Sequence, residues 1–214
     1  MPVPTNHQVE TMKPNRNFLE ALLEGTEAAL DLATDNEAIK AVPIVGSCLK
    51  IAQGINDIRS RVLVAKLTRF IDEPALRASA ESRAFRATLV NDDGQAEKVG
   101  ETLFLVLEKV TDLEKPSMLA KLFAAYLDEV IDSFDLLRLM HAVDMAYIDD
   151  LHELADPNPS DDRDTWRQNL VSLGLTLTKT GTSWDDDGVM TYPETPLGIK
   201  FQQAIQHAMT LRPS

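Results

Sequence analysis

Apolar side chains recur at every third or fourth position along most of this chain, and this spacing limits the folds available to it. Such a period places the apolar residues on one face of an α-helix. It predicts helices at about 17–33 and 51–71, around 99–110, from Pro116 to about 130, and from Ser133 to about 155. We therefore expect a mainly α protein, built as a helical bundle. The long helix after Ser133 would turn these residues inward: Leu136, Leu137, Met140, Val143, Tyr147 and Leu151.

Shifts in composition divide the 214 residues into three parts. Residues 1–16 are polar and contain prolines, which predicts a flexible N-terminal arm. Residues 17–156 hold the helical pattern and would form the α-helical bundle. Aspartates and prolines at 156–162 mark a linker, after which residues 160–211 would form a smaller C-terminal unit.

The C-terminal unit has a different period from the rest of the chain. Residues 175–178 ("LTLT") alternate apolar and polar, and 189–192 ("VMTY") offer a returning strand. Gly174 suits the end of a short helix that would begin at Ser160 or Asp161. Thr195 and the proline after it suit the N-cap and first turn of a closing helix. The expected order is helix, hairpin, helix.

Two resemblances add to this interpretation. The segments "NLVSLGLTLTK" and "YPETPLGIKFQQAI" resemble the end of a winged-helix domain, which implies a small winged-helix-like α+β unit. In that family the helix at 161–173 would read DNA, and Arg163 and Arg167 would be its candidate contacts. Separately, "VPIVG", "IRSR", "AKLTRF", "KLFAAYLD" and "FDLLRLMHAVD" are similar to a group of uncharacterised bacterial helical proteins, which implies a fold but no activity.

The charge distribution argues against nucleic acid as the partner. Acidic residues outnumber basic ones 34 to 21, for a net charge of −13. Three aspartates at 185–187 would lie at the tip of the predicted wing, where DNA binding requires cations. A winged-helix-like unit used for packing or protein contact fits these charges better than one that binds DNA.

One segment of the chain is basic. Residues 50–86 contain eight cations and four acids. The candidate interaction residues here are Arg59, Arg61, Lys66 and Arg69. They suit an acidic protein partner, an anionic membrane surface reached by the amphipathic segment 42–70, or the protein's own acidic helices. The apolar run within 42–55 is shorter than the ~20 residues of a spanning helix, so we expect a core helix here.

No pattern of catalytic residues is present in the sequence. The single cysteine, Cys48, lies in an apolar run and is expected to be an inert buried thiol. His141 and His152 would lie three turns apart on one helix, about 16 Å from each other and too far for one metal ion. The acidic stretch 183–194 matches a calcium loop only in part and is better explained as a hairpin turn. We therefore expect no enzyme activity, no cofactor, no bound metal and no small-molecule substrate.

These features together predict an acidic, cytoplasmic, non-enzymatic protein-interaction or regulatory module, which binds a protein partner or a second copy of itself. A single cysteine fits a reducing compartment, and 1–17 lacks the apolar core of a signal peptide. Three alternatives remain: a membrane-associating effector that uses 42–70, a winged-helix DNA-binding regulator, and an enzyme whose site assembles only in the fold.

Reversing the charges of the four cations at 59, 61, 66 and 69 tests whether they pair within the protein. We expect partial destabilisation, because exposed pairs contribute about 0.2–1 kcal/mol each and one arginine should reach the helix near 128–135. Thermal unfolding of the reversed variant measures this. An unchanged melting temperature combined with lost binding would instead identify a partner surface.

Overall fold

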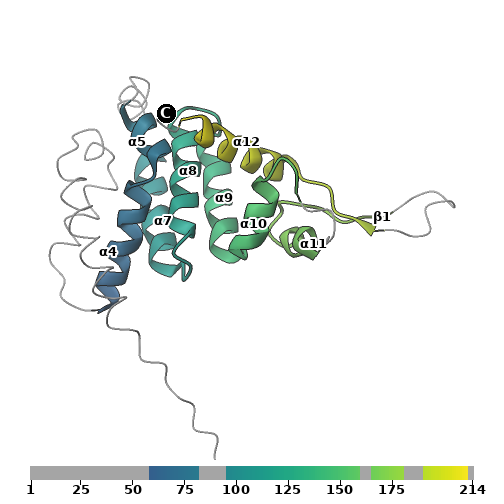
Figure 1. Cartoon of the computed structure of the whole chain (residues 1–214), viewed down its shortest axis with the longest axis horizontal. Coiled ribbons are helices and arrows are strands. Elements are labelled where there is room, and N and C mark those ends of the chain that lie inside the picture. The colour runs from purple at the N-terminus through teal and green to yellow at the C-terminus, as the bar shows by residue number, and fades with distance from the viewer. Residues whose placement is uncertain (1–57, 82–94, 160–164, 181–189, 212–214) are drawn as a thin grey trace, which may run out of the picture.

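The computed structural model describes residues 58–81, 95–159, 165–180 and 190–211, and in these ranges the protein is mainly helical. The first helices are α4 (Ile58–Ile71), α5 (Pro74–Glu81), α7 (Gln95–Lys109) and α8 (Lys115–Leu127). They are followed by α9 (Ser133–Met145), α10 (Ile148–Ala155), α11 (Thr165–Val171) and α12 (Pro196–Thr210). Two short strands, β1 (Lys179–Thr180) and β2 (Met190–Thr191), pair antiparallel between α11 and α12. The prediction of a mainly α fold is confirmed (Figure 1).

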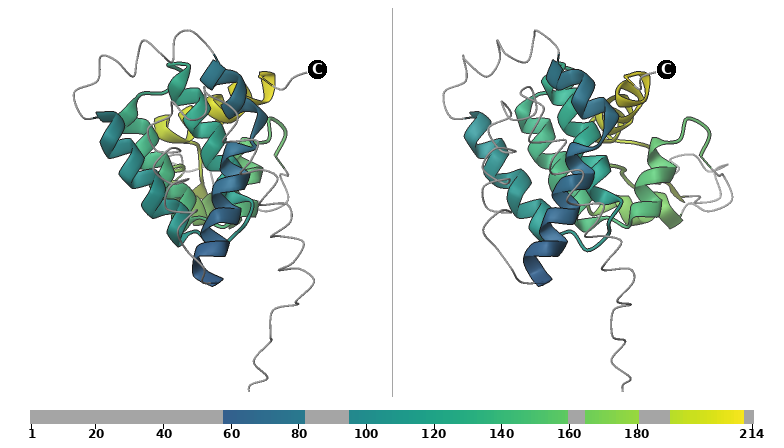
Figure 2. Two further views of the ribbon diagram at one scale, coloured as in Figure 1. Left: turned by 90° about the vertical axis from the view of Figure 1, so that its left-hand side faces the viewer. Right: turned by 60° about the vertical axis from the view of Figure 1, so that its left-hand side comes forward.

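Helix α8 lies at the centre of the bundle. It packs against α4, α5, α9 and α12, and ten of its thirteen residues are buried. Three alanines in α8 (Ala120, Ala124 and Ala125) are fully buried. Ala124 meets Ala75 of α5 and Ala208 of α12, so small side chains let these three helices approach closely. Figure 2 shows α12 crossing the end of the bundle beside α5.

Residues on both sides of the predicted linker belong to one apolar core. Trp166 of α11 and Leu175 belong to the same apolar cluster as Leu119 and Leu139 of the bundle. Phe201 and Ile205 of α12 belong to it as well. The division of the chain at 156–160 stays a prediction, but the buried residues on its two sides form one core.

Polar contacts fasten α12 to the bundle at two points. The carboxylate of Asp128 accepts from the hydroxyl of Ser79 at 2.8 Å and lies 2.8 Å from His207 Nε2, so it joins α5, the end of α8 and α12. Lys200 of α12 pairs with Asp135 of α9, and this hydrogen bond raises the pKa of Lys200. Arg69 is a partner of neither aspartate, so the expected arginine bridge from the basic helix to 128–135 is not made by Arg69. The side chains of the other two arginines, Arg59 and Arg61, lie outside the described residues.

The predicted long helix from Ser133 to Ala155 is wrong. Asp132, not Ser133, caps α9, and its side chain accepts from the backbone N–H of Asp135 at 2.8 Å. The chain then leaves the helix at Ala146 and Tyr147, whose backbones are extended, before α10 begins. Tyr147 therefore lies outside the helical face that would have turned it inward, and it is 74% exposed.

The predicted hairpin is present, but it is shifted along the chain. The paired strand begins at Lys179 rather than at Leu175, and a single bridge joins Thr176 to Glu194. Gly174 has a φ of +71°, the left-handed conformation predicted at this position. Thr195 caps α12, as predicted, and its hydroxyl accepts from the Gly198 N–H at 3.1 Å. The predicted helix at 17–33, the N-terminal arm and the start of the basic helix lie outside the described residues.

Gly198 tests how closely α12 approaches the preceding loop. Alanine normally stabilises a helix by about 1 kcal/mol relative to glycine. Here a Cβ at position 198 would lie 2.1 Å from the carbonyl oxygen of Leu175. We therefore expect Gly198→Ala to lower the free energy of unfolding by about 3 kcal/mol in urea titrations.

Gln203→Ala, at an exposed position of the same helix, is the matched control and should be nearly neutral. A Gly198→Ala variant as stable as this control would show that α12 does not depend on the close approach.

Candidate functional site

A pocket of about 320 Å³ lies where the α4–α5 corner, the α7–α8 loop, α8 and α10 meet. It draws its lining from four separate stretches of the chain. The α4–α5 corner contributes three charged side chains, and α8 and its preceding loop contribute most of the others. The lining residues are Arg69, Asp72, Glu73, Leu113, Glu114, Ser117, Met118, Lys121 and His152.

Each acid of the pocket has a partner. Asp72 pairs with Arg77, and the buried carboxylate of Glu73 accepts from the hydroxyl of Ser117. Glu114 lies 3.2 Å from Nε2 of His152, which joins α10 to the start of α8. The acids of the pocket are therefore committed to contacts within the protein.

The cations of the pocket make fewer hydrogen bonds and ion pairs than they could. Arg69 donates one N–H to the carbonyl oxygen of Leu113 at 2.7 Å and has no carboxylate partner among the described residues. Lys121 is half-buried, and within the described ranges its ammonium has neither an ion pair nor a hydrogen bond. The pocket thus contains cationic N–H donors that the rest of the described structure leaves available.

Two other lysines are structural, and both bind the end of a helix. Lys66 Nζ donates to the carbonyl oxygen of Glu108 at 2.8 Å, at the end of α7. Lys115 Nζ donates to the carbonyl oxygen of Asp144 at 2.9 Å, at the end of α9. Helix C-termini carry partial negative charge, so these ammonium groups are well placed. Burial lowers the pKa of both lysines, and nearby carboxylates oppose that shift only in part.

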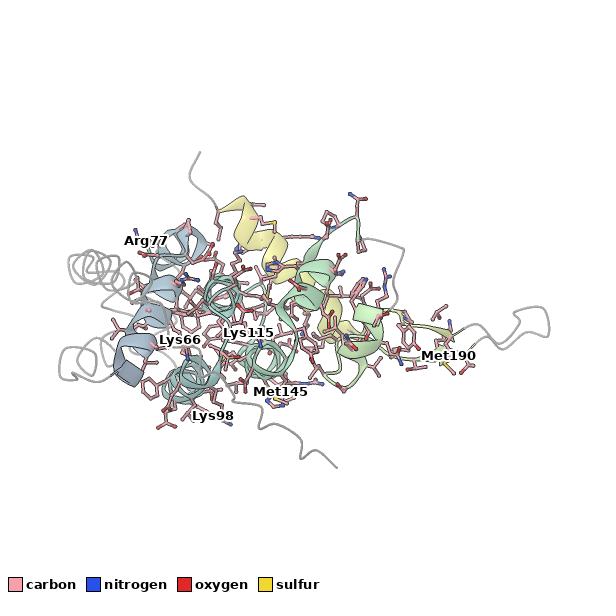
Figure 3. All side chains as sticks on the ribbon, turned by 60° about the horizontal axis from the view of Figure 1, so that its bottom comes forward. Lys66, Arg77, Lys98, Lys115, Met145 and Met190 are labelled. Carbon is pink, nitrogen blue, oxygen red and sulfur yellow. The ribbon has the colours of Figure 1, made fainter. Side chains whose placement is uncertain are left out.

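The outward face of α9 carries large apolar side chains. Phe134, Arg138, His141 and Met145 are spaced by four, three and four residues, which places them on one side of the helix. Phe134 is 66% and Met145 63% exposed, and the exposed Tyr147 stands two residues after Met145, beyond the end of α9. The guanidinium of Arg138 lies 5.5 Å from the centre of the Phe134 ring. We call these five residues the α9 face. Figure 3 shows Met145 and Lys98 at the rim of the molecule, whereas Lys66 and Lys115 lie among the helices.

The candidate cations whose side chains are described do not form one surface. Lys66 is buried, and Arg69 lines the pocket. Arg59 and Arg61 belong to α4, but the structure does not describe their side chains. Arg163 lies outside the described residues. The guanidinium of Arg167 lies 4.3 Å from the centre of the Trp166 ring. Neither Lys66 nor Arg167 is therefore a simple exposed contact.

The histidines also separate. Because α9 ends at Met145 and α10 begins at Ile148, His141 and His152 lie on two different helices and not three turns apart on one. In the parts of the chain that the structure describes, no three His, Cys, Asp or Glu side chains gather as metal ligands would. The acidic stretch at 181–189 lies outside those parts. No described helix is long and apolar enough to cross a bilayer.

Sequence reasoning missed both the pocket and the α9 face. The pocket residues have no common spacing, since they come from four elements, so no sequence signal could have joined them. The α9 face did have a signal, because Phe134 and Met145 stand eleven residues apart and lie off the predicted inward stripe. Comparison with protein families, curated proteins and solved structures finds no match. The two resemblances stay predictions.

Lys66→Met tests whether the buried ammonium of Lys66 makes the stability of the protein depend on pH. The pKa of Lys66 is lower in the folded protein than in the unfolded chain, so the unfolded chain binds more protons between that pKa and about pH 10.4. The stability of the natural protein should therefore rise relative to Lys66→Met as the pH increases through this window. Urea unfolding of both proteins at pH 8 and pH 10 measures the difference.

At neutral pH the same variant should be less stable by about 1 kcal/mol, because the Glu108 carbonyl loses a charged donor while the desolvation of the ammonium, which lowers the pKa of Lys66, is relieved. Lys98→Met removes an exposed ammonium from α7 and controls for the loss of one charge. A stability difference between the natural protein and Lys66→Met that falls with pH would contradict the assignment.

Proposed function

We propose that this chain is a non-enzymatic, cytoplasmic protein-interaction module and that the α9 face is its contact surface. The observation that carries the proposal is the row of three large apolar side chains, Phe134, Met145 and Tyr147, that α9 and its end expose to solvent. Scattered exposed apolar residues are ordinary on a protein surface, but two on one helix face, with a third just beyond the end of the helix, suit a binding partner. Aromatic residues, methionine and arginine are also the residue types enriched at interfaces.

The chemistry of the α9 face indicates its partner. Arg138 and His141 lie between Phe134 and Met145, so the apolar ends flank a polar centre that carries the charge of the Arg138 guanidinium. Such a surface suits an apolar segment that carries acidic side chains. The chain as a whole has a net charge of −13, so a second copy of it is one source of acidic surface and another protein is the other.

Packing of α4 weighs against the membrane alternative. In the described part of the 42–70 segment, Leu67 and Phe70 are large apolar side chains that would enter a bilayer, yet both are buried in the core. Exposing them to lipid would require α4 to leave α8. The protein-interaction proposal requires no such rearrangement.

The finer description of residues 160–211 as winged-helix-like is part of this proposal. Its support is the order of α11, the β1–β2 hairpin and α12, with α12 packed on α8 rather than free. We propose that this unit serves packing and protein contact. Stacking of Arg167 on Trp166 and the acidic residues 185–187 of the sequence both weigh against DNA binding.

A variant with Phe134→Ser, Met145→Ser and Tyr147→Ser tests the proposed surface. These side chains are exposed, so the melting temperature should stay nearly unchanged while partner binding is lost. The measurement is quantitative affinity capture from the native cells, followed by direct binding of each candidate in purified form. Sedimentation of the purified protein tests whether the partner is a second copy.

The matched control replaces three other exposed apolar residues with serine: Leu177, Met190 and Met209. It should keep the partner that the α9 variant loses. The proposal would be contradicted if the α9 variant kept its partner. It would also be contradicted if the natural protein neither self-associated nor bound any purified candidate. Flotation with anionic liposomes or DNA binding at low salt, unaffected by the α9 substitutions, would favour the alternatives.

A further inference from the structure

The pocket between the α4–α5 corner and α8 is independent of the α9 face. Its cations contribute more N–H donors than its described contacts use. Arg69 has five N–H groups, of which one binds the Leu113 carbonyl, and Lys121 has three, of which none binds a described residue. Its acids, in contrast, are each bonded to a neighbouring side chain. The two cations of the pocket therefore have N–H donors that no described contact uses.

We infer that this pocket binds a small organic oxyanion, a molecule whose carboxylate or phosphate group contacts Arg69 and Lys121. Both cations line the same pocket from different helices, α4 and α8. A ligand there would accept charge-assisted hydrogen bonds from two sides, which are among the stronger hydrogen bonds in proteins.

Arg69 is held in position before a ligand arrives. Its bond to the Leu113 carbonyl, 2.7 Å long, joins the guanidinium to the loop before α8. This contact limits the rotation of a long side chain, so less conformational entropy is lost when an anion binds. The planar group then presents its remaining donors as a fork that matches carboxylate or phosphate oxygens.

The start of α8 also borders the pocket. Ser117, in the first turn of α8, lines the pocket, and this turn contains no acidic residue. Glu114 stands at the N-cap position, but its side chain makes no capping hydrogen bond and pairs with His152 instead. The carboxylates of Glu73, which accepts from Ser117, and of Glu114, at the N-cap position, both lie at this helix end and offset its partial positive charge, so the field at the pocket comes mainly from Arg69 and Lys121.

The remaining lining limits the size and charge of the ligand. A volume of about 320 Å³ is at the lower end for small-molecule pockets and equals the space of about ten waters in the liquid. Met118 and Leu113 contribute apolar surface for a short carbon chain. Glu73 and Asp72 are negatively charged neighbours, which disfavours a ligand with many charges. A short dicarboxylate or a small phosphate ester fits these limits.

Lys121→Met is the decisive variant, because no described contact is lost when the ammonium is removed. The probes are succinate and inorganic phosphate, each titrated into the full chain by calorimetry at an ionic strength of about 0.15 M, where the Debye length is about 8 Å. Distant acids of this acidic protein are screened under these conditions, whereas contacts inside the pocket persist. We expect saturable binding of at least one probe, and the ranking of the two identifies the oxyanion class.

Lys121→Met should weaken that binding about tenfold, the effect of one lost charge-assisted hydrogen bond, with an unchanged melting temperature. Lys98→Met removes an exposed lysine outside the pocket and should leave binding within about twofold, since no direct contact with the ligand is lost. Arg69→Met should also weaken binding, but its lost bond to Leu113 makes it the secondary variant. Absence of saturable binding to both probes, or equal binding by Lys121→Met, would overturn the inference. Both results are independent of the α9 face, so either proposal can fail alone.

Discussion

The fold depends on covering α8. Ten of the thirteen residues of this helix are buried, from Lys115 and Pro116 through its alanines to Leu127, so nearly its whole circumference must be covered by other helices. Helices α4, α5 and α9 cover three sides, and α12 closes the fourth. The C-terminal helix is therefore part of the main core and not an appendage to it. This requirement explains why Ala124, Ala75 and Ala208 are small at the point where α5, α8 and α12 meet.

Helix ends explain much of the remaining charge placement. The basic segment at 50–86 could have been a binding surface, yet Lys66 uses its ammonium to bind the end of α7. Lys115 does the same at the end of α9. In both cases a long side chain crosses the packed interior and satisfies a carbonyl that the helix leaves without a partner. A surplus of cations in sequence is thus not evidence of an exposed basic patch. Among the described residues that line the pocket, Arg69 and Lys121 are the ones that keep N–H donors available.

Local sequence patterns identified several elements correctly. Apolar spacing located α7 and α8, and Thr195 was identified as the cap of α12 because its side chain acts on the backbone three residues away. The pattern failed at the end of α9. The spacing of Val143, Tyr147 and Leu151 continues a helical stripe, but the chain is extended at Ala146 and Tyr147, so α10 begins as a separate helix.

The sequence by itself determined the helical class, the approximate extent of α7 and α8 and the turn at Gly174, because each depends on side chains within a few positions of one another. Tertiary structure decided the rest. It turned the ring of Tyr147 outward, buried Lys66, required glycine at 198 beside the Leu175 carbonyl, and brought Arg69, Lys121 and His152 from three helices to one pocket. These outcomes depend on contacts between residues far apart in the chain, and the free energy of such contacts is set by the packing of whole helices rather than by local spacing.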